Sequence, residues 1–324
     1  MILKGGSLME AAKKIPLVVV AGPTASGKTA AAIHICQRFN GEVVSADSMQ
    51  IYKYLSVGTA KPDEEEKAGI FHHLMDFLEP SQPFSVAEYV QLAKEAIADI
   101  HRRGKLPVVV GGTGLYIDSL IYNIQFSESD SDPKLREELQ QYAAEHGNEA
   151  LWNILKEKDP EAADNIHPNN VGRVVRAIEM IELTGKTKTQ QLEESRREPS
   201  PYDVLYLALN YRDRQTLYDR INLRVNIMLE QGLESEARWL LEHGYAPTAA
   251  QAIGYKEMFG YLNGEETLEQ AIEKIQQGSR RYAKRQLTWF RRNEEVQWLY
   301  PDDFEEKTDF LASLCETVSK WRKL

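Results

Sequence analysis

Residues 22–29 carry the strongest chemical signal in the sequence. They are Gly22, Pro23, Thr24, Ala25, Ser26, Gly27, Lys28 and Thr29, which satisfy the pattern GxxxxGK[ST] in full. The glycines of this pattern let successive backbone N–H groups surround phosphate oxygens at the start of a helix, and the lysine adds a positive charge. The Thr29 hydroxyl is suited to hold Mg²⁺. We therefore expect a ligand that carries phosphate groups.

A carboxylate and a glycine-rich turn follow two other apolar runs. Enzymes that transfer phosphoryl groups with this loop usually hold the metal with an acid at the end of a neighbouring strand. The run 106–110 ends instead in Gly111, Gly112, Thr113 and Gly114, and only Asp47, after Val44, is an acid in such a position. Asp47 is a candidate general base, with a helix N-cap or a water-bridged Mg²⁺ ligand as the alternatives. One carboxylate beside a polyphosphate site suits a departing diphosphate as well as a transferred phosphoryl group.

A basic segment lies near the end of the chain. Residues 279–293 contain no acid, and aromatic residues alternate with the cations Arg280, Arg281, Lys284, Arg285, Arg291 and Arg292. The whole chain has a net charge of −10, so this cluster stands out against its average. A solvated helix face is the ordinary interpretation of such a run, and a surface for nucleic acid is the alternative.

The elements that position these residues follow from short β-branched runs. Runs at 16–21, 41–45 and 106–111 are typical of buried parallel strands. Helical patterns at 29–39 and 86–103 separate them, the second with Ser85 as N-cap and Gly104 at its end. This alternation predicts an α/β fold: a P-loop NTPase-like core with a mostly parallel sheet flanked by helices.

The composition changes between residues 127 and 201. Strand patterns disappear, charge density rises, and Asp132-Pro133 and Asp159-Pro160 each place an N-cap before a proline at the first helical position. A strand at 204–209 and helices at 213–231 and 267–293 follow. We expect a discontinuous core of residues 1–126 and 202–324, interrupted by an all-helical insertion at 127–201.

Composition narrows the class of protein. The chain has 324 residues, 42% of them hydrophobic, and its two cysteines, Cys36 and Cys315, belong to no zinc-binding pattern. His72 and His73 are adjacent and point to different faces, which argues against a metal site. The apolar run 15–21 is too short to span a bilayer. We expect a monomeric cytoplasmic protein without a membrane segment.

Taken together, the motifs resemble those of the bacterial tRNA dimethylallyltransferases. Eight blocks occur in the family's order, at residues 22–29, 45–52, 58–62, 72–76, 111–116, 166–169, 252–255 and 284–289. The resemblance extends from about residue 15 to about residue 300. Their combination is far more specific than any single motif.

The resemblance implies an activity and its site. The family transfers the dimethylallyl group from dimethylallyl diphosphate to N6 of the adenine immediately 3′ of the anticodon of tRNA. By this resemblance, the P-loop binds the diphosphate with Mg²⁺, Asp47 is the general base, and Thr113 lies at the reacting centre. Arg220 and Arg224 are one turn apart on a predicted helix, and Arg224 aligns with the family's diphosphate-contacting arginine.

The same resemblance implies a surface for the anticodon stem-loop. It assigns Asp47, Ser48, Met49 and Gln50 to the flipped base, with Thr113 beside them. In the insertion it assigns Arg136, Gly172, Arg173, Val174, Val175 and Arg176. Towards the end of the chain it assigns Gln251, Gly254, Tyr255, Lys256, Lys284, Arg285, Gln286, Thr288, Trp289 and Arg291.

Three other functions are compatible with parts of the sequence. A small-molecule kinase or NTPase shares the P-loop, but predicts a metal-holding acid after the third strand. An isopentenyltransferase acting on free adenine nucleotides needs neither the insertion nor the basic helix. A non-enzymatic RNA-binding module has no use for an intact P-loop beside Asp47.

Overall fold

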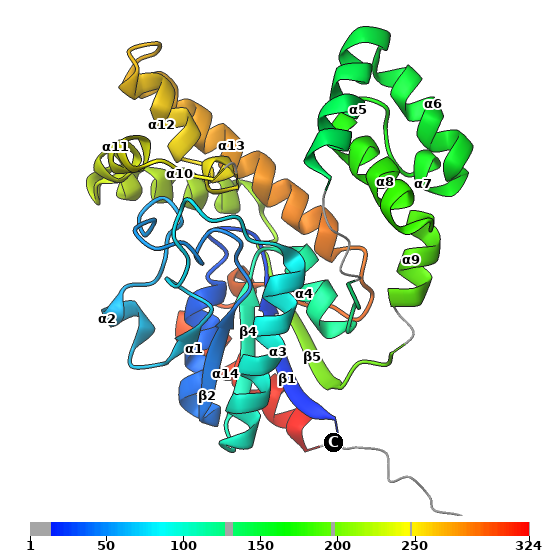
Figure 1. Cartoon of the computed structure of the whole chain (residues 1–324). Helices are drawn as coiled ribbons and strands as arrows, with labels where there is room; N and C mark the ends of the chain where they lie inside the picture. Colours follow the sequence, from blue (N-terminus) through cyan, green and yellow to red (C-terminus); the bar gives the residue numbers. More distant parts are fainter. Residues whose placement is uncertain (1–13, 127–131, 196–197, 247, 324) are drawn as a thin grey trace, which may run out of the picture. The chain divides into compact units, whose positions relative to one another are not determined.

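The computed structural model describes residues 14–126, 132–195, 198–246 and 248–323 (Figure 1). Its internal contacts divide the chain into two units, one of Met1–Ile121 with Pro201–Leu324 and one of Tyr122–Ser200. The first unit holds the sheet, and the second is helical throughout its described part. The expected start of the insertion, residue 127, lies outside the described residues.

A six-stranded parallel sheet forms the centre of the first unit. In the described residues its order is β3-β2-β4-β1-β5-β6. The strands are β1 (Ile15–Ala21), β2 (Gly41–Ser45), β3 (His72–His73), β4 (Leu106–Gly111), β5 (Tyr202–Leu209) and β6 (Gln297–Leu299). This confirms the predicted fold class and four predicted strands. The edge strands β3 and β6 are too short to produce a hydrophobic pattern, so the sequence did not predict them.

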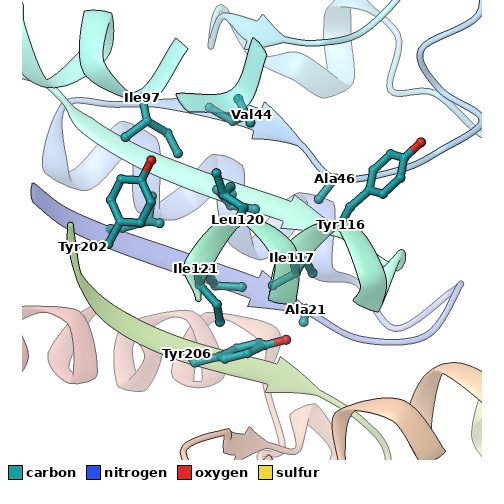
Figure 2. Packing of buried hydrophobic residues seen from close by; sticks show 14 of the residues in the cluster. Ala21, Val44, Ala46, Ile97, Tyr116, Ile117, Leu120, Ile121, Tyr202 and Tyr206 are labelled. Atoms are coloured by element: carbon teal, nitrogen blue, oxygen red, sulfur yellow. The ribbon is translucent and has the colours of Figure 1, made fainter. Parts of the chain in front are cut away.

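Successive residues of the strands point to opposite faces and feed two cores. On one face, Val19, Val44 and Val109 pack with α3 (Val86–Arg102) and α4 (Gly114–Ile121), as Figure 2 shows around Ile97, Tyr116 and Leu120. On the other face, residues such as Val18 and Val108 pack against α1 (Lys28–Phe39) and α14 (Lys307–Arg322). Both faces are covered, which explains the continuous valine runs.

A third core in the first unit carries the helices nearest the site. Elements α11 (Leu233–His243), α12 (Tyr255–Leu262) and α13 (Leu268–Phe290) pack with the chain around Ile51 and Leu55. Helix α10 (Arg214–Glu230) packs on α13 through Leu217, Ile221 and Ala283. The unit is completed by α2 (Glu64–Lys67) and by 3-10 turns at Ala249–Gln251 and Pro301–Asp303.

In its described part, the second unit consists of five helices. They are α5 (Pro133–His146), α6 (Asn148–Lys158), α7 (Pro160–Asp164), α8 (Val171–Thr184) and α9 (Lys188–Ser195). Asp132 and Asp159 cap α5 and α7 as predicted, each accepting a backbone N–H bond and each followed by proline. Apolar residues of α5 to α8, including Leu151, Leu155 and Ile178, form a separate core.

Strand register sets the position of the site. Ala21 is paired with Gly111, and Ser45 with Val110, so β1, β2 and β4 end at the same edge of the sheet. The segments that leave this edge are the P-loop, the Asp47 turn and the Gly112-Thr113 turn. In the described residues, no helix has the length and apolar character needed to cross a membrane.

Candidate active site

The P-loop joins β1 to α1 and places Lys28 as the first helical residue. The Lys28 ammonium donates to the Pro23 carbonyl at 3.3 Å. Burial lowers the pKa of Lys28 to about 8; the negative charge of Asp47 opposes this shift, and Arg224 adds to it. The Ser26 hydroxyl is buried without a hydrogen-bond partner. Buried polar groups normally have a hydrogen-bond partner, so this hydroxyl is an exception within the loop.

The Asp47 turn is fixed by hydrogen bonds within the turn and to the turn that follows β4. Asp47 Oδ1 accepts from the N–H groups of Met49 at 2.9 Å and Gln50 at 3.4 Å. The Ser48 N–H donates to Thr113 Oγ1 at 3.1 Å, and the Thr113 hydroxyl lies 3.4 Å from Ser48 Oγ. Asp47 and Thr113, predicted from separate motifs, are therefore neighbours. The turn-capping bonds of Asp47 engage one of its two carboxylate oxygens.

Helix α13 ties the P-loop to the glycine-rich turn through Gln286. The side-chain oxygen of Gln286 accepts from the Thr24 N–H at 3.1 Å, and its amide nitrogen donates to the Gly112 carbonyl at 3.0 Å. A Cβ at Gly112 would lie 2.1 Å from the Gln286 amide, and one at Gly114 would lie 2.3 Å from the Trp289 ring. The glycines of this turn are required because α13 packs directly on the backbone.

Two arginines of α10 face the P-loop. Arg220 donates to the Ala25 carbonyl at 3.0 Å, and Arg224 donates to the Ala60 carbonyl at 3.1 Å. Burial lowers the pKa of Arg224, although the negative charges of Glu66 and Asp47 oppose the shift. The Arg224 Nε is buried without a partner. A buried guanidinium with a free donor is well suited to an anionic ligand.

These residues surround one cavity of about 910 Å³. Of the candidate residues named from the sequence, those that line it are Thr24, Ala25, Gly27, Lys28, Thr29, Asp47, Ser48, Met49, Gln50, Arg220, Arg224, Gln251, Lys256, Arg281, Arg285 and Gln286. A phosphate-binding loop, a carboxylate and a buried arginine therefore share one space. Gly22, Pro23, Ser26 and Thr113 support the wall rather than line it.

Sequence reasoning missed several lining residues. Tyr282 stands one turn before Gln286 on α13; burial and the charge of Asp47 raise the pKa of Tyr282 to about 12, whereas hydrogen bonds with Thr113 and Gln286 lower it. Thr59, Ala60 and Glu66 line the opposite wall. The four-residue spacing from Tyr282 to Gln286 is the signal that could have identified Tyr282.

Comparisons with known proteins agree with this geometry. The model of the IPP transferase family matches residues 50–293, and that of the isopentenyl transferase family matches residues 15–76. The tRNA dimethylallyltransferase of Acetivibrio thermocellus is 52% identical over 300 residues, covering 92% of this chain and 96% of that protein. The enzyme of the same name from Caldanaerobacter subterraneus is 49% identical, covering 94% of this chain and 98% of that protein.

The chain belongs to the tRNA dimethylallyltransferase family. It is therefore a transferase.

Solved structures of this family have the same fold. The full-length tRNA isopentenylpyrophosphate transferase of Bacillus halodurans is 43% identical with a TM-score of 0.71, covering 96% of this chain and 98% of that one. A eukaryotic dimethylallyltransferase described as acting on tRNA is 33% identical with a TM-score of 0.75, covering 88% of this chain and 73% of that one.

The expected tRNA-binding residues at α13 fall into two groups. Lys284, Arg285, Thr288 and Arg291 are exposed. The other two face inward: Gln286 is 5% exposed, with both ends of its amide bonded within the protein, and Trp289 donates to Asp118 at 2.7 Å. For these two, the structure indicates support of the site.

Three further residues expected to contact tRNA have buried side chains. Val174 and Val175 are 0% and 2% exposed, because both lie on the apolar stripe of α8 in the core of the second unit. Tyr255 is 0% exposed and packs in the third core of the first unit. Its neighbour Gly254 is also buried, whereas Gln251 and Lys256 are exposed at the cavity.

The remaining candidate tRNA-binding residues lie on the second unit. Gly172 and Arg173 are exposed. Arg136 and Arg176 each bind the buried carboxylate of Glu179, at 2.8 and 2.6 Å. Burial acts to raise the pKa of Glu179, but hydrogen bonds from Arg176 and Arg136 outweigh it and keep the pKa below its usual value.

Proposed function

We propose that this enzyme transfers the dimethylallyl group from dimethylallyl diphosphate to N6 of the adenine immediately 3′ of the anticodon in tRNA. The observation that carries the proposal is the shared cavity, in which Lys28 and Arg224 lie near the carboxylate of Asp47. A site that joins an anion cradle to the Asp47 carboxylate suits a reaction with a diphosphate leaving group and a nucleophile that loses a proton.

The reaction breaks the bond between the allylic carbon and the diphosphate oxygen and forms a bond from that carbon to N6. The bonding electrons leave with the diphosphate, and the N6 proton passes to Asp47. The adenine amine is a poor nucleophile because its lone pair is delocalised into the ring. A positioned carboxylate that accepts the proton contributes about 10²- to 10⁴-fold in rate.

Negative charge develops on the diphosphate as the bond breaks. We infer that the P-loop N–H groups, Lys28 and Arg224 stabilise this charge. The Lys28 ammonium and the Arg224 guanidinium are each held by a backbone carbonyl. Lys28 has a pKa near 8, so most of its ammonium groups are charged at neutral pH. Arg224 offers its buried, unpartnered Nε to the same anion.

The residues around the P-loop also fit a divalent cation. The Thr29 hydroxyl and the carboxylates of Asp47 and Glu66 line the same cavity, and Mg²⁺ prefers such oxygen ligands together with substrate phosphates. Among the described residues, no three His, Cys, Asp or Glu side chains gather into a metal-binding cluster. When bound, Mg²⁺ neutralises part of the diphosphate charge, and we infer Thr29 as its ligand.

For tRNA, we infer that the target adenine leaves the anticodon loop and enters the cavity beside Asp47. Extruding a base costs a few kcal/mol, which contacts to the rest of the loop must offset. The exposed cations Lys284, Arg285 and Arg291 of α13 supply phosphate contacts next to the cavity. Arg173 of the second unit is a further candidate, because it is exposed.

The deciding experiment follows label from dimethylallyl diphosphate to an unmodified anticodon stem-loop. We expect labelling by the wild type and a loss of about 10²- to 10⁴-fold in Asp47→Asn, which keeps the shape and Oδ1 of the side chain. Asp309→Asn, on the exposed first turn of α14, is the matched control and keeps full activity. RNA binding by the Asp47 variant is measured in parallel and stays within about threefold.

Other products would point to the other functions. Label on AMP would indicate an enzyme that prenylates free adenine nucleotides. Hydrolysis of ATP without transfer of label would return the P-loop to phosphoryl chemistry. Loss of RNA binding together with activity in Asp47→Asn would remove the general-base assignment.

A further inference from the structure

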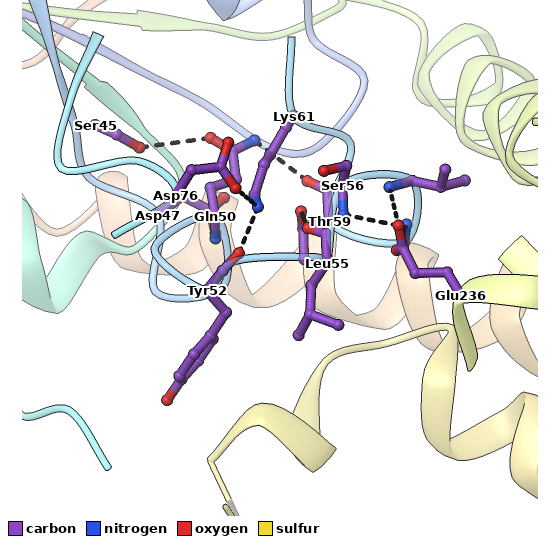
Figure 3. Close-up of polar contacts among 12 residues, drawn as sticks. Ser45, Asp47, Gln50, Tyr52, Leu55, Ser56, Thr59, Lys61, Asp76 and Glu236 are labelled. Carbon is purple, nitrogen blue, oxygen red and sulfur yellow. Dashed lines mark hydrogen bonds and ion pairs between the residues drawn. The ribbon is translucent and has the colours of Figure 1, made fainter. Parts of the chain in front are cut away.

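A loop at residues 55–61 lines the cavity with Gly58, Thr59 and Ala60 and carries two active-site contacts. Its Ala60 carbonyl accepts from Arg224 at 3.1 Å, which is the fixed polar partner of that guanidinium among the described residues. The Thr59 and Ala60 carbonyls accept from the Gln50 amide at 3.2 and 3.1 Å. Gln50 belongs to the Asp47 turn, so the loop contacts that turn as well as Arg224. Figure 3 shows its contact with Gln50.

One carboxylate from a distant helix holds this loop in place. Glu236 of α11 accepts hydrogen bonds from three consecutive backbone N–H groups, at 2.8 Å from Ser56, 2.9 Å from Val57 and 3.0 Å from Gly58. Successive N–H groups that converge in this way form an anion-binding nest. Figure 3 shows Glu236 reaching the loop beside Ser56. An acidic side chain of the protein itself occupies the nest.

Tyr255 completes the arrangement from a second helix. Its hydroxyl donates to Glu236 Oε1. Its ring lies so close to the loop that a Cβ at Gly58 would stand 2.6 Å from it. Burial and the adjacent Glu236 carboxylate raise the pKa of Tyr255, which keeps the phenol protonated as a donor. The buried Tyr255 thus connects the core of α11 and α12 to the cavity wall.

We propose that Glu236 is a positioning residue: by holding the N–H groups of residues 56–58, it fixes the Ala60 carbonyl and, through it, the orientation of Arg224 towards the diphosphate. The proposal rests on the proposed function, and extends it to a residue outside the cavity lining. It also connects two motifs that are distant in the sequence, because Gly58 of one motif packs against Tyr255 of the other.

Glu236→Gln tests the proposal with little change in volume. A glutamine supplies one acceptor and one N–H₂ group, so when its oxygen serves Ser56 and Val57, its nitrogen faces the Gly58 N–H and repels it. Glu234→Gln is the matched control, because Glu234 lies on the same helix and pairs only with the exposed Arg238 in the described structure. The probe is inorganic pyrophosphate with Mg²⁺, titrated by calorimetry.

We expect Glu236→Gln to weaken pyrophosphate binding about tenfold, since small misplacements of a binding group are costly. Glu234→Gln should leave it unchanged. Tyr255→Phe, which keeps the ring against Gly58 and removes only the hydroxyl, should weaken binding about two- to threefold. That variant keeps the proposal testable if Glu236→Gln does not fold.

A double-mutant cycle separates positioning from a general loss of structure. In an Arg224→Gln background, Glu236→Gln should weaken pyrophosphate binding less than twofold. The same loss in both backgrounds, or no loss in the wild-type background, would overturn the proposal. A wild type that binds pyrophosphate but transfers no label to RNA would refute the proposed function alone, and one that binds no pyrophosphate would overturn both.

Discussion

Lys28 gives the sharpest test of how the site balances ligand binding against the stability of the fold. Its ammonium is buried at the P-loop with the Pro23 carbonyl as its hydrogen-bond acceptor, and burial lowers its pKa from 10.5 to about 8. The charged form is therefore less favourable in the folded protein than in the unfolded chain. We predict that Lys28→Met stabilises the unliganded enzyme while abolishing diphosphate binding.

The size of the expected stability change follows from the lowered pKa of Lys28. At about 1.36 kcal/mol for each pH unit, a pKa lowered from 10.5 to about 8 corresponds to a cost of about 3 kcal/mol at neutral pH. The side chain is half-buried rather than fully enclosed, so solvent in the cavity reduces this cost. We expect Lys28→Met to raise the free energy of unfolding by about 1–3 kcal/mol at pH 7.

The pH dependence has a definite sign. Below pH 8 the lysine is charged in both states and the cost is complete. Between pH 8 and 10.5 the unfolded state binds more protons, so the wild type gains stability as pH rises and the advantage of methionine shrinks. Urea unfolding of both proteins at pH 7, 8.5 and 9.5 measures this difference.

Pyrophosphate should reverse the order of the two proteins. At a thousand times its dissociation constant, a ligand that binds only the folded state adds about 4.1 kcal/mol to the wild type, and the variant gains nothing. A Lys28→Met protein that is less stable than the wild type at pH 7 without ligand would refute the reasoning. So would an advantage that does not shrink above pH 8.

Two further variants test contacts within the protein that are made by residues expected to bind tRNA. Gln286→Ala should lower the free energy of unfolding by about 2 kcal/mol, because it leaves the Thr24 N–H and the Gly112 carbonyl unpaired. Urea unfolding measures this loss of stability. Filter binding should show that the affinity for the stem-loop is unchanged. Glu179→Gln should destabilise the helical unit by about 2 kcal/mol above pH 5, because the lowered pKa of Glu179 makes its carboxylate stabilising there and less so in acid. Faster trypsin cleavage between residues 132 and 195 of the variant would show this loss of stability. Equal cleavage rates for the variant and the wild type would contradict it.

Local sequence patterns determined the main strands, the phosphate-binding loop and several helix N-caps of this protein. The valine runs of β1, β2 and β4 identify strands covered on both faces, because their hydrophobicity is continuous over a few residues. The P-loop is recognisable because its function depends on consecutive backbone groups. From these, parallel strand order alone brings Asp47 and Thr113 to one edge. The N-caps at Ser85, Asp132 and Asp159 are equally local, and the structure confirms them.

Tertiary packing decided which helix side chains are buried and form contacts within the protein. Gln286 lies between Ala283 and Phe290 on the buried stripe of α13, yet the same segment carries exposed cations, and helical spacing does not tell what packs against a stripe. The buried side chains of Val174 and Val175 follow the same logic in α8. Glu236 meets its partners 178 to 180 residues away in sequence. Contacts of that range depend on how α11 packs on the core, and no local pattern encodes them.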